Sequence, residues 1–176
     1  MALPRATPTL ADTNAGDQTG AWLDEPVTPR YETILLATDG SRASEPASEQ
    51  AIDLATQVGA RLLVVSVVAS GRQHPEASAA DGHTSETRDA LAANAQAIVQ
   101  KARASGADAT FLVWEGDAGE AIVAAADAES ADLIVVGSHG RSGVTRFLIG
   151  SVSDFVVRHA HCPVMVVRGK AEAARH

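Results

Sequence analysis

Short apolar runs alternate with helical patterns along most of the chain. Each run is rich in Val, Ile, Leu and Ala, the composition of a buried strand. Between the runs, apolar residues recur at the three- and four-residue intervals that place them on one face of a helix. These patterns predict strands at residues 33–37, 62–68, 109–114, 133–136 and 163–167, and helices at 47–58, 85–105, 118–129 and 151–159. In the first helix, the face predicted to turn inward is Ala47, Ala51, Leu54, Ala55 and Val58.

The strand runs are continuously apolar rather than alternating, which indicates that helices cover both faces of the sheet. Strict alternation of strand and helix then predicts an α/β protein with an open, doubly wound, parallel five-stranded sheet. Ligands of such sheets bind beyond the carboxyl ends of the strands, where the strand order reverses. The turns after the first and fourth strands, at Asp39 and Gly137, are therefore the places to look for a site.

Three segments follow from the distribution of these patterns. Residues 1–30 contain four of the seven prolines and no periodic apolar face, so we expect a flexible N-terminal tail. Residues 31–170 carry all of the strand and helix signals and are predicted to form the domain, interrupted by a polar loop over residues 70–83. Residues 171–176 are predicted to be a short C-terminal tail.

Charge is unevenly spread over the chain, whose net charge is −8. Residues 137–170 hold five basic side chains and one acidic one, which is +4, so the rest carries −12. An acidic body argues against nucleic-acid binding. The local basic segment favours a small anionic ligand, with chance clustering on a solvated face as the alternative.

Two absences bear on location. No apolar run approaches the ~20 residues of a membrane helix, so no membrane insertion is expected. The start of the chain has no apolar stretch typical of a signal peptide, and Cys162, the single cysteine, cannot form an internal disulfide. We therefore expect a cytoplasmic protein.

A glycine pattern follows the fourth strand. Gly137-Ser138-His139-Gly140 is separated by nine residues from Gly150-Ser151, where the fourth helix is predicted to begin. Glycines permit close backbone approach, and the free N–H groups and positive dipole end of a helix start attract anions. Arg141 and Arg146 add positive charge within the loop. Ordinary loop geometry would explain two such glycines, but the full spacing between strand and helix favours a phosphate site. Neither the Gly-x-Gly-x-x-Gly pattern nor the Walker pattern occurs.

These residues resemble the universal stress proteins, in particular the ATP-binding branch with its Gly-x2-Gly-x9-Gly-Ser/Thr motif. The resemblance covers about residues 32–168 and rests on ILLATDGS at 34–41, IVVGSHGRSG at 134–143, GSV at 150–152 and CPV at 162–164. It implies strand order 3-2-1-4-5. It also implies a homodimer paired through the last strand, which starts at Pro163 and runs to Arg168.

The same resemblance implies a role for individual residues. Asp39 would lie near the ribose and the metal-bound phosphates, and could hold Mg²⁺ or Mn²⁺ through water. The backbone of Ala37 and Val67 would contact adenine; Ala37 stands where some ATP-binding members have proline. The expected nucleotide-binding residues are Ala37, Thr38, Asp39, Val67, Gly137, Ser138, His139, Gly140, Arg141, Gly150, Ser151 and Val152.

Three functions stay open at this point. The leading one is an ATP-binding stress-response and signalling module, whose nucleotide state is read by an unidentified protein partner. The second is a slow ATPase or an autophosphorylating enzyme, although the sequence offers no convincing general base: His139 has no visible carboxylate partner. The third is a nucleotide-free structural dimer. His159, His161 and Cys162 lie too close together on a helix end to favour one metal ion.

Overall fold

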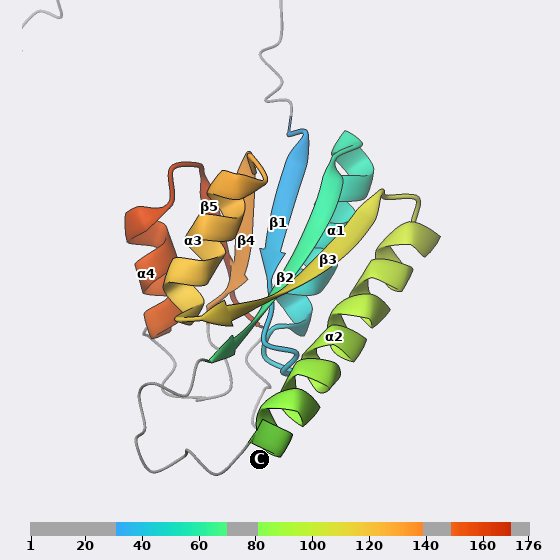
Figure 1. Cartoon of the computed structure of the whole chain (residues 1–176). Helices are drawn as coiled ribbons and strands as arrows, with labels where there is room; N and C mark the ends of the chain where they lie inside the picture. Colours follow the sequence, from blue (N-terminus) through green and yellow to red (C-terminus); the bar gives the residue numbers. More distant parts are fainter. Residues whose placement is uncertain (1–30, 70–80, 139–148, 170–176) are drawn as a thin grey trace, which may run out of the picture.

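The computed structural model describes residues 31–69, 81–138 and 149–169, and the two predicted tails lie outside this part of the chain. Its elements are β1 (Thr33–Ala37), α1 (Glu45–Val58), β2 (Arg61–Ala69), α2 (Asp81–Ala104), β3 (Ala109–Gly116), α3 (Ala118–Ala128), β4 (Leu133–Gly137), α4 (Ser151–His159) and β5 (Val164–Val167). All strand pairs are parallel, in the order β3-β2-β1-β4-β5 (Figure 1). The predicted fold class and strand order are confirmed.

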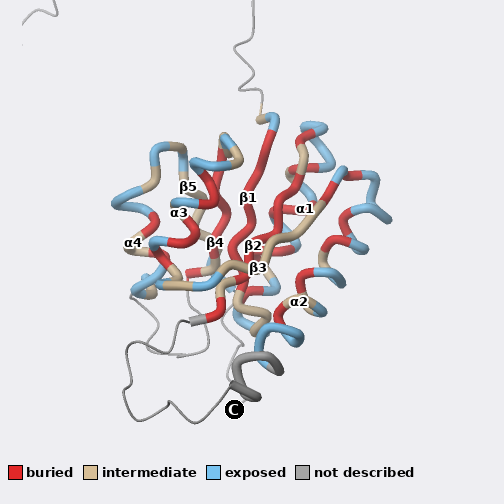
Figure 2. The backbone as a smooth tube through the Cα atoms, viewed as in Figure 1, coloured by how far each residue is buried: buried red, intermediate tan, exposed pale blue. Residues whose placement is uncertain are grey.

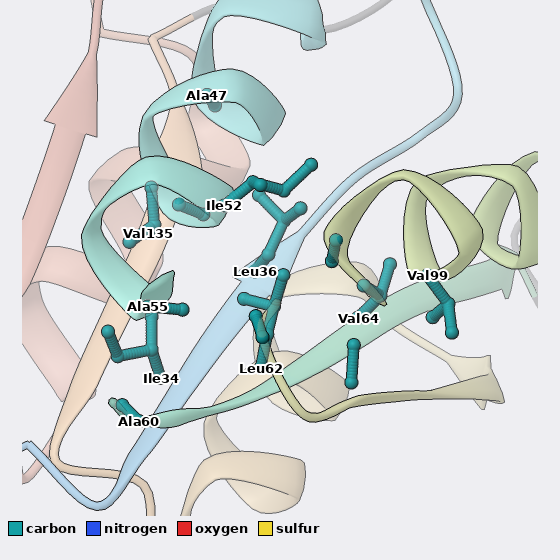
Figure 3. Close-up of a cluster of buried hydrophobic side chains, with 14 of the residues drawn as sticks. Ile34, Leu36, Ala47, Ile52, Ala55, Ala60, Leu62, Val64, Val99 and Val135 are labelled. Atoms are coloured by element: carbon teal, nitrogen blue, oxygen red, sulfur yellow. The ribbon is translucent and has the colours of Figure 1, made fainter. Parts of the chain in front are cut away.

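The sheet separates two hydrophobic cores. Helices α1 and α2 cover one face, and α3 and α4 cover the other (Figure 1). On the first face, Ile34 and Leu36 of β1 pack with Leu62 and Val64 of β2 beneath the two helices (Figure 3). The residues between them, such as Leu35, point to the opposite core. Burial on both faces explains why the strands are continuously apolar.

The central strand β1 is buried at every position, while the outer surfaces of the helices are exposed (Figure 2). Leu35 is paired in register with Leu63 on one side and Ile134 on the other. The chain winds from β1 to β2 and β3 in one direction, and returns to β4 and β5 in the other. The order therefore reverses between β1 and β4, which leaves a crevice at their carboxyl ends.

The main differences from the sequence-based expectation concern α2, β3 and the inward face of α1. Helix α2 begins at Asp81, inside the expected polar loop. The sequence pattern misses this start because the first turn of the helix is polar and gives no periodic signal. Strand β3 continues to Gly116, two residues beyond the predicted Trp114. The side chain of Val58, expected to face the core, is 41% exposed at the last turn of α1. The buried face of α1 runs instead through Ala47, Ser48, Ala51, Ile52 and Ala55.

Candidate functional site

A cleft of about 320 Å³ opens at the carboxyl ends of β1, β2 and β4. It lies at the point of strand-order reversal, where ligands of open α/β sheets bind. The starts of α3 and α4 close it on the side that these two helices cover. Its described lining is Ala37, Thr38, Asp39, Ser44, Val65, Val67, Ala118, Ile122, Val136, Gly137, Gly150, Ser151, Val152 and Ser153.

The turn after β1 is held by a chain of hydroxyl groups. The Ser44 hydroxyl donates to the Ser41 carbonyl at 2.8 Å, and the Thr38 and Ser44 hydroxyl oxygens are 2.9 Å apart. Each hydroxyl has one proton, so Thr38 donates to Ser44. Thr38 Oγ1 also accepts from the Gly40 amide at 3.2 Å. This chain fixes the backbone on both sides of Asp39.

Asp39 is half-buried at the edge of the cleft. Its Oδ1 accepts a hydrogen bond from the Ser41 amide at 3.0 Å, so the side chain also closes its own turn. Gly40 follows with φ +70, a left-handed conformation that glycine adopts without strain. Among the described residues that line the cleft, Asp39 is the one ionisable group.

The opposite end of the cleft is the start of α4. Gly150 is the N-cap, with φ −61 and ψ 154, and its carbonyl accepts from the Asp154 amide at 2.8 Å. Glycine has no side chain to cap the helix, and no acceptor in the described chain bonds the amides of Ser151 and Val152. These amides and the positive end of the helix dipole favour a negative group.

A small hydrogen-bond network attaches this helix start to the sheet. The Ser153 hydroxyl donates to the Gly137 carbonyl at 2.6 Å. The Gly150 amide donates to the Ser138 carbonyl at 2.8 Å, and the Ser138 amide donates to the Val167 carbonyl at 2.8 Å. The ends of β4 and β5 thus fix where the amides of Ser151 and Val152 lie.

The remaining wall is apolar. It comes from Val65 and Val67 of β2, Val136 of β4, and Ala118 and Ile122 of α3. Apolar side chains at one end, and N–H groups without an acceptor among the described residues at the other, make a cleft suited to a ligand with a flat apolar part and an anionic part.

Most of the predicted site residues meet at this cleft. Ala37, Thr38, Asp39, Val67, Gly137, Gly150, Ser151 and Val152 line it. Ser138 is buried and contributes through its backbone, as described above. His139, Gly140 and Arg141 lie outside the described residues, as does Arg146.

Several lining residues were not predicted: Ser44, Val65, Ala118, Ile122, Val136 and Ser153. Val136 could have been predicted, since it is the last residue of the fourth apolar run and directly precedes Gly137. The backbone angles of Gly150, φ −61 and ψ 154, can be adopted by any residue, so its position does not require the conformational freedom of glycine. If glycine is needed there, the need is for space rather than for a special conformation.

The neighbouring histidines and the cysteine serve other contacts. His159 Nδ1 is 2.8 Å from the Phe155 carbonyl oxygen, and His161 Nδ1 is 3.1 Å from Asp127 Oδ1. Burial raises the pKa of the Cys162 thiol, which packs at the edge of the core beneath α3 and α4. Within residues 31–69, 81–138 and 149–169, no group of three or more His, Cys, Asp or Glu is placed to hold a metal ion.

No helix in the described part of the chain is both long enough and apolar enough to cross a membrane. The fold and cleft together define an open α/β protein with a cleft at its topological switch point. A model of the universal stress protein family matches residues 30–168. The chain belongs to the universal stress protein family.

Individual relatives agree with this assignment. A universal stress protein of Methanocaldococcus jannaschii is 33% identical over 143 residues, covering 78% of this chain and 82% of that protein. The structure of universal stress protein UspA from Lactobacillus plantarum superimposes with a TM-score of 0.67 at 32% identity, covering 79% of this chain and 99% of that one. A universal stress protein solved in complex with cAMP superimposes with a TM-score of 0.61 at 28% identity, covering 79% and 98%.

Proposed function

We propose that this universal stress protein binds ATP in the cleft between β1, β2, β4 and the start of α4, and that it acts as a signalling module rather than a fast enzyme. The observation that carries the proposal is the start of α4, where the amides of Ser151 and Val152 have no acceptor among the described residues and share a cleft with an apolar wall. A relative solved with cAMP supports an adenine nucleotide as the ligand class.

The cleft fits such a ligand in size and polarity. Its volume of about 320 Å³ lies within the roughly 300–1,000 Å³ range of small-molecule sites. Val67 and Ile122 offer an apolar surface for adenine, and the α4 amides offer donors to phosphate. Asp39 would stand near a phosphate-bound Mg²⁺ or Mn²⁺, which needs few protein ligands when phosphates supply the others. Bound metal would offset phosphate charge.

Tryptophan fluorescence gives a direct test of ATP binding. The chain has two tryptophans, Trp22 and Trp114, so a Trp22→Phe variant leaves Trp114 as the reporter. Trp114 is the register partner of Val67, and both pack on the same core. ATP with Mg²⁺ should change the emission saturably and raise the melting temperature. At 100 times the Kd, binding adds about 2.7 kcal/mol to stability.

The result that counts against the proposal is a protein free of endogenous nucleotide whose emission and melting temperature millimolar ATP leaves unchanged. Nucleotide released from the freshly purified, denatured protein is therefore measured first. Turnover of ATP is measured in the same sample. Because the described lining offers Asp39 as its one ionisable side chain, we expect hydrolysis to be slow.

We further propose that the protein is a cytoplasmic homodimer paired through residues 163–168, and that a partner protein reads its nucleotide state. Strand β5 is at the edge of the sheet, and all four of its residues are half-buried. The carbonyls of Pro163 and Val167 accept hydrogen bonds from Ile134 and Ser138. N–H and C=O groups of one residue point to the same edge, so the alternate residues Val164 and Val166 point theirs away from β4.

This geometry gives a sharp test of the dimer. Val166→Pro removes an outward N–H without touching a bond to β4, and proline is tolerated on edge strands. Analytical ultracentrifugation should find Val166→Pro monomeric and the matched variant Val166→Thr dimeric. A proline variant that stays dimeric would place the interface elsewhere. Affinity capture with and without ATP then identifies proteins that bind one nucleotide state.

A further inference from the structure

Strand β2 extends past the end of β1 at the carboxyl edge of the sheet. The last register pair between these two strands is Ala37 with Val65, whereas β2 stays paired with β3 as far as Ala69. Residues 66–69 therefore have a neighbouring strand on the β3 side only. On their other side lies the cleft at the switch point, whose lining includes Val67.

The backbone N–H of Val67 points toward the space beyond the end of β1. Alternate residues of a central strand direct their N–H and C=O groups to opposite neighbours. The Leu62 amide donates to the Asp108 carbonyl just before β3, whereas the Val65 carbonyl accepts from the Thr38 amide just after β1. Val67, two residues after Val65, therefore also points its groups to the β1 side. No acceptor in the described chain bonds its amide.

The natural acceptor for this amide is the Thr38 carbonyl, and a buried serine already occupies it. The Thr38 amide bonds Val65 at 3.0 Å, so the next rung of a parallel ladder would join the Val67 N–H to the Thr38 carbonyl. That carbonyl instead accepts a hydrogen bond from the Ser66 hydroxyl at 3.0 Å. Ser66 is fully buried, and its side chain lies on the face of β2 opposite to that of Val67.

We propose that Ser66 is a positioning residue of the nucleotide site: it supplies the Thr38 carbonyl with a donor and so keeps the Val67 amide open to the base. This inference rests on the proposed function for its ligand. A nucleotide base carries ring-nitrogen acceptors in its plane, and one N–H beside an apolar wall gives it a directional contact that the wall cannot supply. Ser66 itself touches no ligand and acts through Thr38 and Val67.

Hydrogen-bond couplings between ¹⁵N and carbonyl ¹³C nuclei test each bond separately in the labelled, nucleotide-free full chain. We expect Thr38 N to couple to the Val65 carbonyl, and Val67 N to show no coupling to the Thr38 carbonyl. In Ser66→Ala the Thr38 carbonyl loses its donor and should accept from the Val67 amide, so the second coupling should appear. A general loss of stability would weaken couplings and would not create one.

Val64→Ala is the matched control, because it removes buried methyl groups two residues earlier on the same face of β2. It should leave both couplings as they are in the parent. A coupling between Val67 and Thr38 in the parent, or its absence from folded Ser66→Ala, overturns the proposal. Ser66→Cys keeps the size of the side chain with only a weak donor, and takes the place of the alanine variant if that protein does not fold.

Titrations with ATP and adenosine show which end of the ligand depends on Ser66. Adenosine has the base without the phosphates, so Ser66→Ala should weaken both ligands by the same factor, roughly three- to tenfold for one hydrogen bond. A loss confined to ATP would assign the effect to the phosphate end through Asp39 and overturn the proposal. ATP that shifts no amide of the parent contradicts the proposed function, whereas equal ATP affinity in parent and Ser66→Ala contradicts the role of Ser66 alone.

Discussion

The contact between α3 and α4 gives the sharpest structural prediction, because it leaves no room at Gly119. A Cβ built on Gly119 would lie 2.6 Å from Cδ1, 2.7 Å from Cγ and 3.0 Å from Cβ of Phe155. Rotation of the Phe155 ring about its Cβ–Cγ bond can relieve only the contact with Cδ1, because Cγ lies on that axis and Cβ does not move. In Gly119→Ala, α4 must therefore move away from α3, and the amides of Ser151 and Val152 must move with it.

The expected cost follows from two opposing effects. Overpacking a well-filled contact costs about 1–3 kcal/mol, whereas replacing glycine by alanine in a helix gains up to about 1 kcal/mol. Gly119 is in the first turn of α3, so the gain there is the smaller term. We expect a net destabilisation of about 1–2 kcal/mol, which lowers the melting temperature by roughly 2–8 °C for a chain of this size. ATP affinity should fall about tenfold, because charge-assisted bonds to phosphate depend on donor position.

Urea unfolding and ATP titration calorimetry measure the two effects separately. Phe155→Ala is the partner variant for a double-mutant cycle: it removes the Cγ and Cδ1 contacts, so the double variant should be more stable than the sum of the single effects predicts. A Gly119→Ala protein that is more stable than the parent and binds ATP equally well would refute the reasoning. It would mean that α4 adjusts without moving its amides.

Three further predictions concern the cleft and its surroundings. Gly150→Val should keep its stability within about 1 kcal/mol, because φ −61 and ψ 154 suit any residue, yet its ATP affinity should fall at least about tenfold because the side chain fills space at the cleft. Unchanged binding in calorimetry would place the phosphates elsewhere. Ser153→Ala should lower the free energy of unfolding in urea by about 1–3 kcal/mol, because it leaves the Gly137 carbonyl without its 2.6 Å donor, whereas Ser151→Ala at an exposed position should lower it by less than about 0.5 kcal/mol. Equal effects of the two variants would contradict the role of the Ser153 hydrogen bond. Burial raises the pKa of Cys162, so less thiolate is present at a given pH, and maleimide should label the folded protein more slowly than the urea-unfolded protein at pH 8. This difference in rate should shrink as the pH rises through the raised pKa, and equal rates at pH 8 would show an accessible thiol.

The fold could be predicted largely from local pattern because each strand is a continuous apolar run and each helix has a periodic face. Periodicity does not state which strands are neighbours, and the order 3-2-1-4-5 came from the resemblance to universal stress proteins. Element ends were less certain where the signal is polar. The first turn of α2, from Asp81, carries no apolar residue at helical spacing, so the sequence pattern predicts a loop there.

The candidate site was predictable where a residue's role depends on its place in the chain. Asp39 and Gly137 follow strands, and Gly150 precedes a helix, so sequence position alone brings them to the same edge of the sheet. Ile122 and Ser153 could not be found this way. Their place in the lining depends on how α3 and α4 lie against the sheet, which is decided by contacts such as that between Gly119 and Phe155.

The start of α4 has no capping side chain, and hydrogen bonds to the sheet hold it instead. A Ser or Asp at position 150 would use its own oxygen to satisfy an amide of the first turn, which typically adds about 1 kcal/mol of stability over alanine but only roughly a few tenths of a kcal/mol over glycine. Gly150 cannot do so, and the helix start is held instead from outside, by the Ser153 hydroxyl on the Gly137 carbonyl and the Gly150 amide on the Ser138 carbonyl. The sheet therefore fixes the position of α4, while the amides of Ser151 and Val152 have no acceptor in the part of the chain that the structure describes. An anionic ligand can accept the hydrogen bonds that a capping side chain would otherwise accept. Ligand binding and the order of this helix start should therefore rise and fall together.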